Sequence, residues 1–542
     1  MNAYKNPLLT EPAINIQEGH QQILTDLQAN ILRHHKRKYS RYLFLRFHEG
    51  AQIFVRKFMA KMGNGFVNND VGIQLTSASQ QFGKETLNSK SFTESNEIFG
   101  MYLTFQGYNF LELSNLAPAD IAFQNASEKL TSATKGFHTG EPDNSFSNLH
   151  AMILVASNNR RDLDKCINAL KSEMQISKNG EPLYISIIGN QSGESMFDRD
   201  NKTYSEHFGY VDGISQPRFF PSSNSQKSSV QLSSFSTLDT VLVRDLGGED
   251  KFQSFGSFLV FLKLEQDVVA FEKLIKQIRG LNLKDKSGAP LVENDDDAKA
   301  IIMGRYPKGA SILKKGRKDE YCFDNNYDYD ELVSDGKEWK KDDQGIGCPF
   351  FSHARKANPR TVDSRYKNNN RITRRGVPYQ DSENKKGLLF MSFQRNIQEQ
   401  FEKLLTEMLH SSQLNGVHAG MDLLTGHHNN TRIINGNPNA VIKPTDPLIT
   451  YRGGAYFFAP SLSFFKNITK FYPHIEEDIN MAKSTLRFER KAVKIFDDFK
   501  NIQMKPIEFG DHRDEMIKSI LEEANQNKAI NEIATSKIGP VA

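Results

Sequence analysis

The spacing of apolar residues in the first half of the chain predicts helices mixed with short buried strands. Apolar residues recur at helical spacing over 21–33 and again over 160–176, which predicts a helix in each segment. Short apolar runs predict strands, at 42–47, 101–105, 150–155 and 184–188. The first half is therefore expected to be a domain built from both kinds of element.

The second half repeats this pattern. It predicts strands at 257–262 and 387–393 and helices at 268–278 and 397–408. Because helices and strands do not strictly alternate, antiparallel sheets with helices on one face fit the order better than a doubly wound parallel sheet. The expected fold class is α+β with two related halves.

Composition shifts along the chain suggest where the domains begin and end. We expect an N-terminal arm over 1–20, an N-terminal domain over 21–235, a C-terminal domain over 236–510 and a helix or tail over 511–542. Lys, Asp, Asn and Gly dominate from about 281 to 345, which we interpret as a charged surface insertion in the C-terminal domain.

Charge and cysteine content exclude several function classes. The 542 residues carry 69 basic and 65 acidic side chains, a balance that does not indicate nucleic acid as a partner. Three widely spaced cysteines, Cys166, Cys322 and Cys348, argue against a disulfide framework and a Cys-rich metal site. Without a signal-like N-terminus or an apolar run of about 20 residues, the expected location is the cytoplasm, with no membrane partner.

One segment with chemical potential runs from Cys348 to Arg360. His353 stands there beside Arg355, Lys356 and Arg360, and an Asn-Pro pair holds the chain off regular helix. A dianionic cofactor would suit such a loop. An ordinary loop histidine within a basic nucleic-acid or phosphate patch explains this segment equally simply, and on this segment alone it is preferred.

Two further segments carry candidate groups. Gly209 and Gly213 bracket Asp212, and glycines permit unusual backbone angles and close approach to a flat ligand, although such a pattern is also a common turn. Arg374 lies in a basic run before Gly376, which by itself is typical of a solvated charged face.

Taken together and in their order along the chain, the three segments resemble the dye-decolorizing (DyP-type) haem peroxidase family. The family's motifs are a GxxDG distal loop, a proximal His that opens an H-x-R-x-x-N-P-R-like stretch, and an R-x-G-x-P turn. The resemblance spans roughly residues 21–467 and includes similar sequence segments at 26–32, 304–309, 393–397 and 448–461. It implies two ferredoxin-like domains with antiparallel sheets, a dimeric α+β barrel-like duplication in one chain. It also implies one haem b per chain, bound non-covalently, in agreement with the absence of a Cys-x-x-Cys-His motif.

The resemblance also implies a role for each candidate residue. His353 would ligate the iron, and a downstream carboxylate would accept its other ring N–H; Asp422 is the best candidate, although it could equally cap a turn. Asp212 would move the proton that hydrogen peroxide must lose and regain. Since a carboxylate remains a base in mild acid, an acid-shifted activity optimum is expected. Arg374, favoured over Arg375 by the family pattern, would supply positive charge.

Further residues are expected to contact the haem. Guanidinium groups bind carboxylates bidentately, so Arg360 and Arg355 are candidates for the propionates. Leu388 and Phe390 alternate on one predicted strand and could both line the distal wall, although core packing explains either one alone. Gly209 and Gly213 belong to the same set through the distal loop. His207, just before that loop, is expected to be structural.

The function that follows from the resemblance is a peroxidase that uses hydrogen peroxide to oxidise dyes, phenols or other electron donors. One alternative is a haem-binding or haem-handling protein on the same fold, with incidental peroxidase activity. Another is a basic surface-binding protein without cofactor. A homo-oligomer is possible. Long-range electron transfer through tryptophan is doubtful, since Trp339 lies in the charged insertion and Tyr306 stands where relatives often have Trp.

Overall fold

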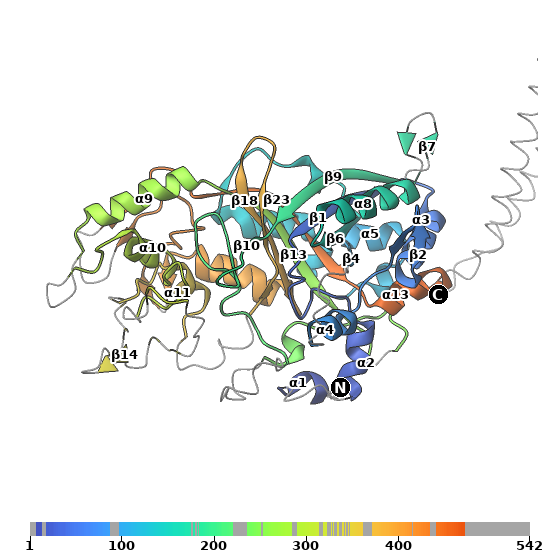
Figure 1. Ribbon diagram of the computed structural model, residues 1–542, viewed down its shortest axis with the longest axis horizontal. Helices are drawn as coiled ribbons and strands as arrows, with labels where there is room; N and C mark the ends of the chain where they lie inside the picture. Colours follow the sequence, from blue (N-terminus) through green and yellow to red (C-terminus); the bar gives the residue numbers. More distant parts are fainter. Residues whose placement is uncertain are drawn as a thin grey trace, which may run out of the picture. The chain divides into compact units, whose positions relative to one another are not determined.

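The N-terminal half of the computed structural model is an antiparallel sheet with two helices packed on it (Figure 1). In chain order its elements are β1 (Tyr39–Phe47), α3 (Gln52–Asn64), β4 (Ile98–Leu103), β6 (Ala151–Ser157), α8 (Arg160–Met174) and β9 (Ile185–Glu194). The strands lie in the order β4-β6-β1-β9, and β1 pairs antiparallel with both of its neighbours. This β-α-β-β-α-β order is the ferredoxin-like arrangement.

The C-terminal half repeats the same arrangement. Its elements are β13 (Phe255–Gln266), α9 (Val268–Gly280), β16 (Thr373–Arg374), β17 (Val377–Gln380), β18 (Lys386–Gln394), the π-helical turns η8 (Ile397–Glu402) and η9 (Leu404–Leu409), and β23 (Ile449–Ala459). The strand order is β16-β18-β13-β23, with β17 also paired to β18. The duplicated α+β fold class predicted from the sequence is therefore confirmed.

The two sheets join into one barrel-like sheet. At one junction β23 pairs with β4 through Phe458 and Leu103. At the other junction β17 lies against β9. The two strands are so close that a Cβ atom added to Gly193 would lie only 2.9 Å from Cγ1 of Val377. Side chains inside the barrel come from both halves, as with Phe44 and Phe261, whose ring centroids are 5.4 Å apart. Because helices cover the outer face, the strands are apolar on both faces and read as continuous apolar runs.

Shorter elements complete the fold. They include α1 (Pro7–Thr10), α2 (Glu18–Asp26), β2 (Phe66–Asn68), β3 (Val71–Ile73), α4 (Ala78–Thr86), α5 (Phe105–Phe110), α6 (Ile121–Gln124), α7 (Ala126–Ala133), β5 (His138–Thr139), β7 (Ser177–Lys178), β8 (Glu181–Pro182), β10 (Met196–Asp198), β11 (Thr203–Ser205), β12 (Val243–Arg244), α10 (Asp295–Met303), α11 (His353–Ala357), β19 (Gln413–Leu414), β20 (Val417–His418), β21 (Arg432–Ile433), β22 (Val441–Ile442) and α13 (Leu462–Asn467). Where the chain is described, no helix has the length and apolar character that crossing a bilayer requires.

The structure describes residues 7–471, apart from 13–17, 87–96, 175–176, 179–180, 183, 221–235, 251–252, 284–289, 314–317, most of 322–346, 361–370, 415 and 434–440. The last part of the expected C-terminal domain, the tail over 511–542 and Cys322 lie outside the described residues. So does the side chain of Trp339, whose backbone forms β15 (Trp339–Lys340) with β14 (Val333–Ser334). The domain boundaries stay a prediction.

The predicted helix over 21–33 was too long. Helix α2 ends at Asp26, and the following segment turns through Asn30, whose φ is +69°. The carboxylate of Asp26 accepts hydrogen bonds from the backbone N–H of Ser463 at 2.7 Å and the hydroxyl of Ser254 at 2.6 Å. Leu27 and Ile31 are still buried, because the irregular segment packs into the core. The apolar spacing over 21–33 therefore predicted correctly which residues are buried, but not where the helix ends.

The surface interpretation of residues 281–345 was wrong for part of that segment. It contains α10, which begins with a capping box between Asn294 and Asp297 and buries Ile301 and Ile302. The aspartates at 295–297, which counted toward the charged surface insertion, are thus the first turn of a helix, where carboxylates are favoured. Tyr306, just after this helix, reaches the cavity described below.

Candidate active site

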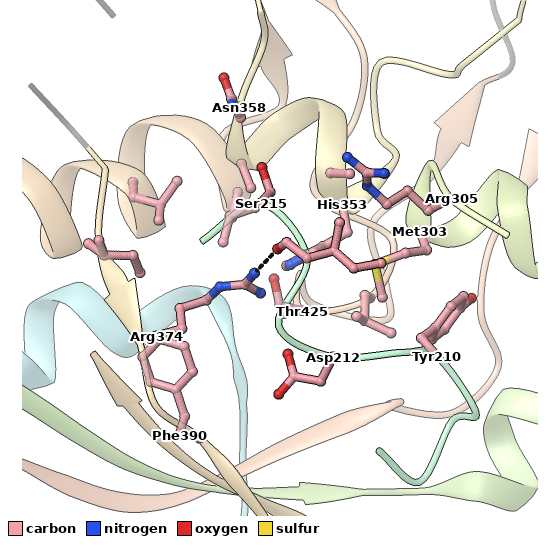
Figure 2. A pocket seen from close by; sticks show the side chains of 18 of the residues that line it. Tyr210, Asp212, Ser215, Met303, Arg305, His353, Asn358, Arg374, Phe390 and Thr425 are labelled. Carbon is pink, nitrogen blue, oxygen red and sulfur yellow. Dashed lines mark hydrogen bonds between the residues drawn. The ribbon is translucent and has the colours of Figure 1, made fainter. Parts of the chain in front are cut away.

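A cavity opens in the C-terminal half between α11, η9 and the ends of β13 and β18. Its volume is about 300 Å³, within the range of small-molecule sites. Apolar side chains form much of its lining, among them Leu262, Leu264, Met303, Leu388, Phe390, Phe401, Leu404, Leu405, Leu424 and Ile449. Asp212, His353 and Arg374 line the same cavity, and Figure 2 shows the three side chains within it. Tertiary structure thus brings together the three residues that the sequence separated by up to 162 positions (374 − 212).

His353 begins α11, and its ring is held by a carboxylate. Its Nδ1–H donates to Oδ2 of Asp422 at 2.5 Å, and Asp422 is fully buried. Burial by itself would raise the pKa of Asp422, but the charge and hydrogen bond of His353 and further donors outweigh it and lower that pKa. Because Nδ1 is bound to Asp422, Nε2 is the ring nitrogen left for a ligand in the cavity.

The loop that carries Asp422 is fixed by its own contacts. Oδ1 of Asp422 accepts from the backbone N–H of Leu424 at 2.6 Å, and Oδ2 accepts from the hydroxyl of Thr425 at 3.0 Å. Arg432, fully buried on β21, donates from Nη2 to the carbonyl oxygen of Asp422 at 2.9 Å and from Nε to that of Met421 at 3.0 Å. Sequence reasoning missed Arg432, since its spacing gave no signal that it would reach this loop.

Arg355 does not lie in the cavity, which corrects its expected role. It is buried, and its Nη1 forms an ion pair with Oδ2 of Asp342 at 2.6 Å. The guanidinium also donates to the carbonyl oxygens of Cys348 and Asp342 and stacks on the rings of Tyr329 and Phe350. On the short helix α11, Arg355 projects to a different side from His353, so it serves the packing of this segment.

Arg360 does line the cavity. Its backbone φ of +47° is left-handed, and its Nη2 donates to the hydroxyl of Ser215 at 3.3 Å. The guanidinium also lies 4.1 Å from the centre of the Tyr327 ring. Arg355 and Arg360 are five residues apart, and both were predicted to bind the haem propionates. Of the two, the structure places only Arg360 at the cavity.

The loop around Asp212 has the unusual backbone that its glycines suggested. Gly209 and Gly213 have φ of +92° and +82°, where side chains are strained. Neither glycine lines the cavity, however, so a close approach of either to a flat ligand is not what the structure shows. Their role is to turn the chain so that Asp212 enters the cavity. Its Oδ1 accepts from the N–H of Gly213 at 2.6 Å.

Arg374 and Arg375 point to opposite sides of the short strand β16 and its continuation. Nη2 of Arg374 donates to the carbonyl oxygen of Ile214 at 2.8 Å, in the Asp212 loop (Figure 2). Arg375 is buried and donates to the carbonyl oxygens of Asn30 and Ile31 at 2.7 and 2.8 Å. Burial lowers the pKa of Arg375 to about 9. Only Arg374 of this pair faces the cavity.

Sequence reasoning missed Arg371, which lines the cavity together with Arg305, Arg360 and Arg374. Nη2 of Arg371 donates to the carbonyl oxygen of Ser215 at 3.1 Å, and Arg374 binds the carbonyl oxygen of the adjacent residue, Ile214. Burial, with the nearby charges of Arg360 and Arg374, lowers the pKa of Arg371 to about 10. Arg360, Arg371 and Arg374 gather beside the loop at 214–215, which favours an anionic ligand in this part of the cavity.

The remaining candidates are placed as follows. Leu388 and Phe390 both line the cavity from alternate positions of β18. His207 lies outside it and donates from Nε2 to the carbonyl oxygen of Tyr379 at 2.9 Å, a structural contact. Glu206, which was not predicted, lines the cavity and accepts from the N–H groups of Phe208 and Tyr210 at 2.9 and 3.0 Å. Burial raises the pKa of Glu206.

The arrangement can support chemistry on a ligand between an imidazole and a carboxylate. His353 can ligate a metal through Nε2, Asp212 can accept and return a proton, and Arg374 can stabilise negative charge. The apolar lining excludes water, which strengthens such charge interactions.

Comparison with known proteins agrees with this geometry. Residues 208–418 match the family model for the C-terminal part of Dyp-type peroxidases. A multifunctional dye peroxidase of Amycolatopsis sp. is 27% identical over 497 residues, which cover 82% of this chain and 96% of that protein. A dye-decolorizing peroxidase of Mycetinis scorodonius is 26% identical over 59% of this chain and 66% of its own length. Among solved structures, a DyP-type peroxidase of Anabaena sp. superposes with a TM-score of 0.68 at 27% identity, covering 86% of this chain and 99% of that one.

Proposed function

The chain belongs to the dye-decolorizing peroxidase family and is a haem-dependent peroxidase, and from this premise we propose that His353, Asp212 and Arg374 divide the reaction between them. The observation that carries the proposal is the one cavity that these three side chains share. His353 binds the cofactor, Asp212 moves the proton, and Arg374 stabilises charge.

The residues around the cavity fit haem b. A buried carboxylate orients an imidazole toward the cavity, the donor set of a haem-iron ligand, and apolar walls suit the porphyrin. Bound haem supplies the redox-active iron that accepts oxidising equivalents from hydrogen peroxide and passes them to a reductant. In the proposal Arg360 binds a propionate, and Leu388 and Phe390 pack on the ring. Cys166 and Cys348 are buried outside the cavity, consistent with non-covalent binding.

Asp212 is proposed as the group that takes a proton from one oxygen of hydrogen peroxide and returns it to the other, which leaves as water. Since Oδ1 already accepts from Gly213, the proton is assigned to Oδ2. Arg374, fixed by Ile214, would stabilise the negative charge that develops as the O–O bond breaks. Because its partner is a backbone carbonyl in the Asp212 loop, the two groups keep a fixed relationship without reorganisation.

The reductants are proposed to be dyes, phenols or other organic electron donors, and the names of the relatives indicate dyes as substrates of those proteins. Tyr306 lines the cavity and is nearly buried, which places an oxidisable ring at its wall. The proposal includes no nucleic-acid or membrane partner. The proposed compartment is the cytoplasm, consistent with the free thiols of Cys166 and Cys348, and cell fractionation tests this point.

Replacing Asp212 by Asn tests the proton-transfer role. The Asp212→Asn variant keeps the size of the side chain, so haem and its Soret band are expected to be retained. Its rate of reaction with hydrogen peroxide should fall by roughly 10²–10⁴-fold, the usual contribution of general acid–base catalysis. Asp200→Asn, at an exposed position outside the cavity, is the matched control. An Asp212→Asn protein with an unchanged rate would favour the haem-handling alternative.

A further inference from the structure

Three histidines gather on the outer side of the cavity wall. They are His138, His427 and His428, and each offers a ring nitrogen within 4.8 Å of those offered by the other two. The rings of His427 and His428 stack with centroids 4.7 Å apart, and His138 meets His428 edge to face at 5.4 Å. These residues line neither the cavity nor the route assigned to the reaction.

Two well-anchored segments bring the histidines together. His138 lies on β5, which pairs in parallel with the long strand β23 and places His138 opposite Thr450. His427 and His428 follow directly from the turn that contains Thr425, whose hydroxyl binds Asp422. The turn that contains Thr425 is closed by a bond from the N–H of Gly426 to the carbonyl oxygen of Asp422 at 3.0 Å, and the next turn by one from the N–H of Asn430 to the carbonyl oxygen of His427 at 3.1 Å. The cluster is therefore held on both sides by fixed backbone, as a preorganised ligand set requires.

The ring nitrogens are available for a ligand. Nδ1 of His428 is buried and has no hydrogen-bond partner among the described residues, an arrangement that calls for a partner. Nδ1 of His427 accepts a long 3.3 Å bond from the N–H of Asn429, which is easily given up. Burial, and then the charge of His427, lower the pKa of both His138 and His428. A lowered pKa favours the neutral imidazole, which is the form that ligates metals.

We propose that His138, His427 and His428 form a binding site for a late transition-metal ion, Zn²⁺ in the first instance, separate from the haem. Three imidazoles with an open fourth position for water are a common ligand set for this ion. Nitrogens bound to tetrahedral Zn²⁺ at about 2.0–2.1 Å lie about 3.4 Å apart, so the cluster closes by little more than side-chain rotation. Asp446 is ion-paired with Lys273 at 3.0 Å and brings little net negative charge to the cluster, so the site depends on its three imidazoles.

The site would act as a clamp between two parts of the structure. Bound Zn²⁺ ties β5 to the loop that carries Asp422, since His427 lies five residues after it. Phe137 and Thr425, which line the cavity, adjoin the two sides of the clamp. The expected consequence is a more stable fold when the metal is bound, because a ligand that binds the folded state alone stabilises it.

The test is Zn²⁺ binding to the full-length, haem-loaded protein after removal of any histidine tag. Competition with a chromophoric chelator should give one Zn²⁺ per chain, with iron counted separately from the Soret band. Each of His138→Ala, His427→Ala and His428→Ala should weaken Zn²⁺ binding by at least roughly 10–100-fold. That is the loss usually seen when a residue that only contacts a metal ligand is removed, and here the ligand itself is removed. His418→Ala, an exposed histidine on β20, is the control and should bind as the unaltered chain does.

A second measurement covers the case in which an alanine variant folds poorly. His138→Gln keeps a polar side chain of similar size, and Zn²⁺ should raise the Tm of the unaltered chain and of His418→Ala but not of His138→Gln. The proposal is overturned if the unaltered chain fails to hold Zn²⁺ against the chelator. It is equally overturned if its affinity survives the loss of each of the three histidines. Neither result bears on the haem site, which the Asp212→Asn experiment tests separately.

Discussion

Nδ1 of His353 donates a 2.5 Å hydrogen bond to Oδ2 of Asp422, although 69 residues separate the two in the chain. This bond fixes which ring nitrogen faces the cavity. Asp422 is in turn held by Leu424, Thr425 and Arg432, so the orientation of the imidazole depends on a whole loop and not on one contact.

The first prediction concerns this bond. Asp422→Asn keeps the shape of the side chain but removes the charge that orients and polarises His353. We expect the variant to bind haem more weakly and its peroxidase activity to fall by roughly 10–100-fold, as is usual when a partner of a metal ligand is lost. Haem retention during gel filtration and kcat measure the two effects. Asp381→Asn, in an outer loop, serves as the control, and full activity in Asp422→Asn would contradict the assigned role of this carboxylate.

The second prediction separates the adjacent arginines 374 and 375. Arg374→Lys should lower the rate with hydrogen peroxide while leaving Tm nearly unchanged, because a lysine cannot keep both the charge position and the bond to Ile214. Arg375→Lys should lose its bonds to Asn30 and Ile31 and destabilise the fold by about 3 kcal/mol. Thermal unfolding and stopped-flow kinetics are compared on both proteins. The assignment fails if the two variants exchange these phenotypes.

The third prediction separates Arg355 from Arg360. Arg355→Met breaks a buried ion pair with Asp342 and should destabilise the protein by about 3–5 kcal/mol. Arg360→Met, at the cavity wall, should instead weaken haem binding with a smaller effect on stability. Haem titration and denaturant unfolding distinguish the two. If Arg355→Met loosened the haem without affecting stability, the corrected assignment would have to be reversed.

The fourth prediction is a pH effect at His150. Burial, with the charges of Arg46 and His48, lowers the pKa of His150 to about 4 in the folded chain. Its Nδ1 accepts from the N–H of Phe47 at 2.8 Å, a bond that protonation at this nitrogen would break. At His150 the folded state therefore binds fewer protons than the unfolded state between about pH 4 and 6.5. The stability that the neutral ring contributes is lost as the pH falls through that window.

The size of the effect follows from the shift in pKa. His150 is only partly buried, so solvent screening reduces the effect of the shift from 6.5 to about 4, and a loss of about 1–2 kcal/mol is expected. His150→Gln removes the titrating group, so its free energy of unfolding should change less than that of the unaltered chain between pH 6.5 and pH 4. Urea unfolding at several pH values measures this difference. Parallel curves for the two proteins would show that His150 does not titrate as stated.

Much of the fold could be predicted from the sequence. The strands β1, β6, β13 and β18 and the helices α8 and α9 lie where the apolar spacing placed them, because burial on a barrel face or under a helix imposes a local period. The end of α2 could not be predicted, since Asp26 bonds to Ser254 and Ser463, far away in the chain. The acidic start of α10 was misread because a capping box and a solvated loop share the same residues.

By itself the sequence determined the duplicated α+β pattern and, through the order of its motifs, a likeness to one peroxidase family that named Asp212, His353 and Arg374. Only tertiary structure decided which neighbours of those residues face the cavity. It placed Arg360 at the wall and turned Arg355 onto Asp342, and it set Arg374 and Arg375 on different sides. The physical reason is that side-chain direction on a short helix or strand depends on partners distant in the chain, which local spacing does not encode.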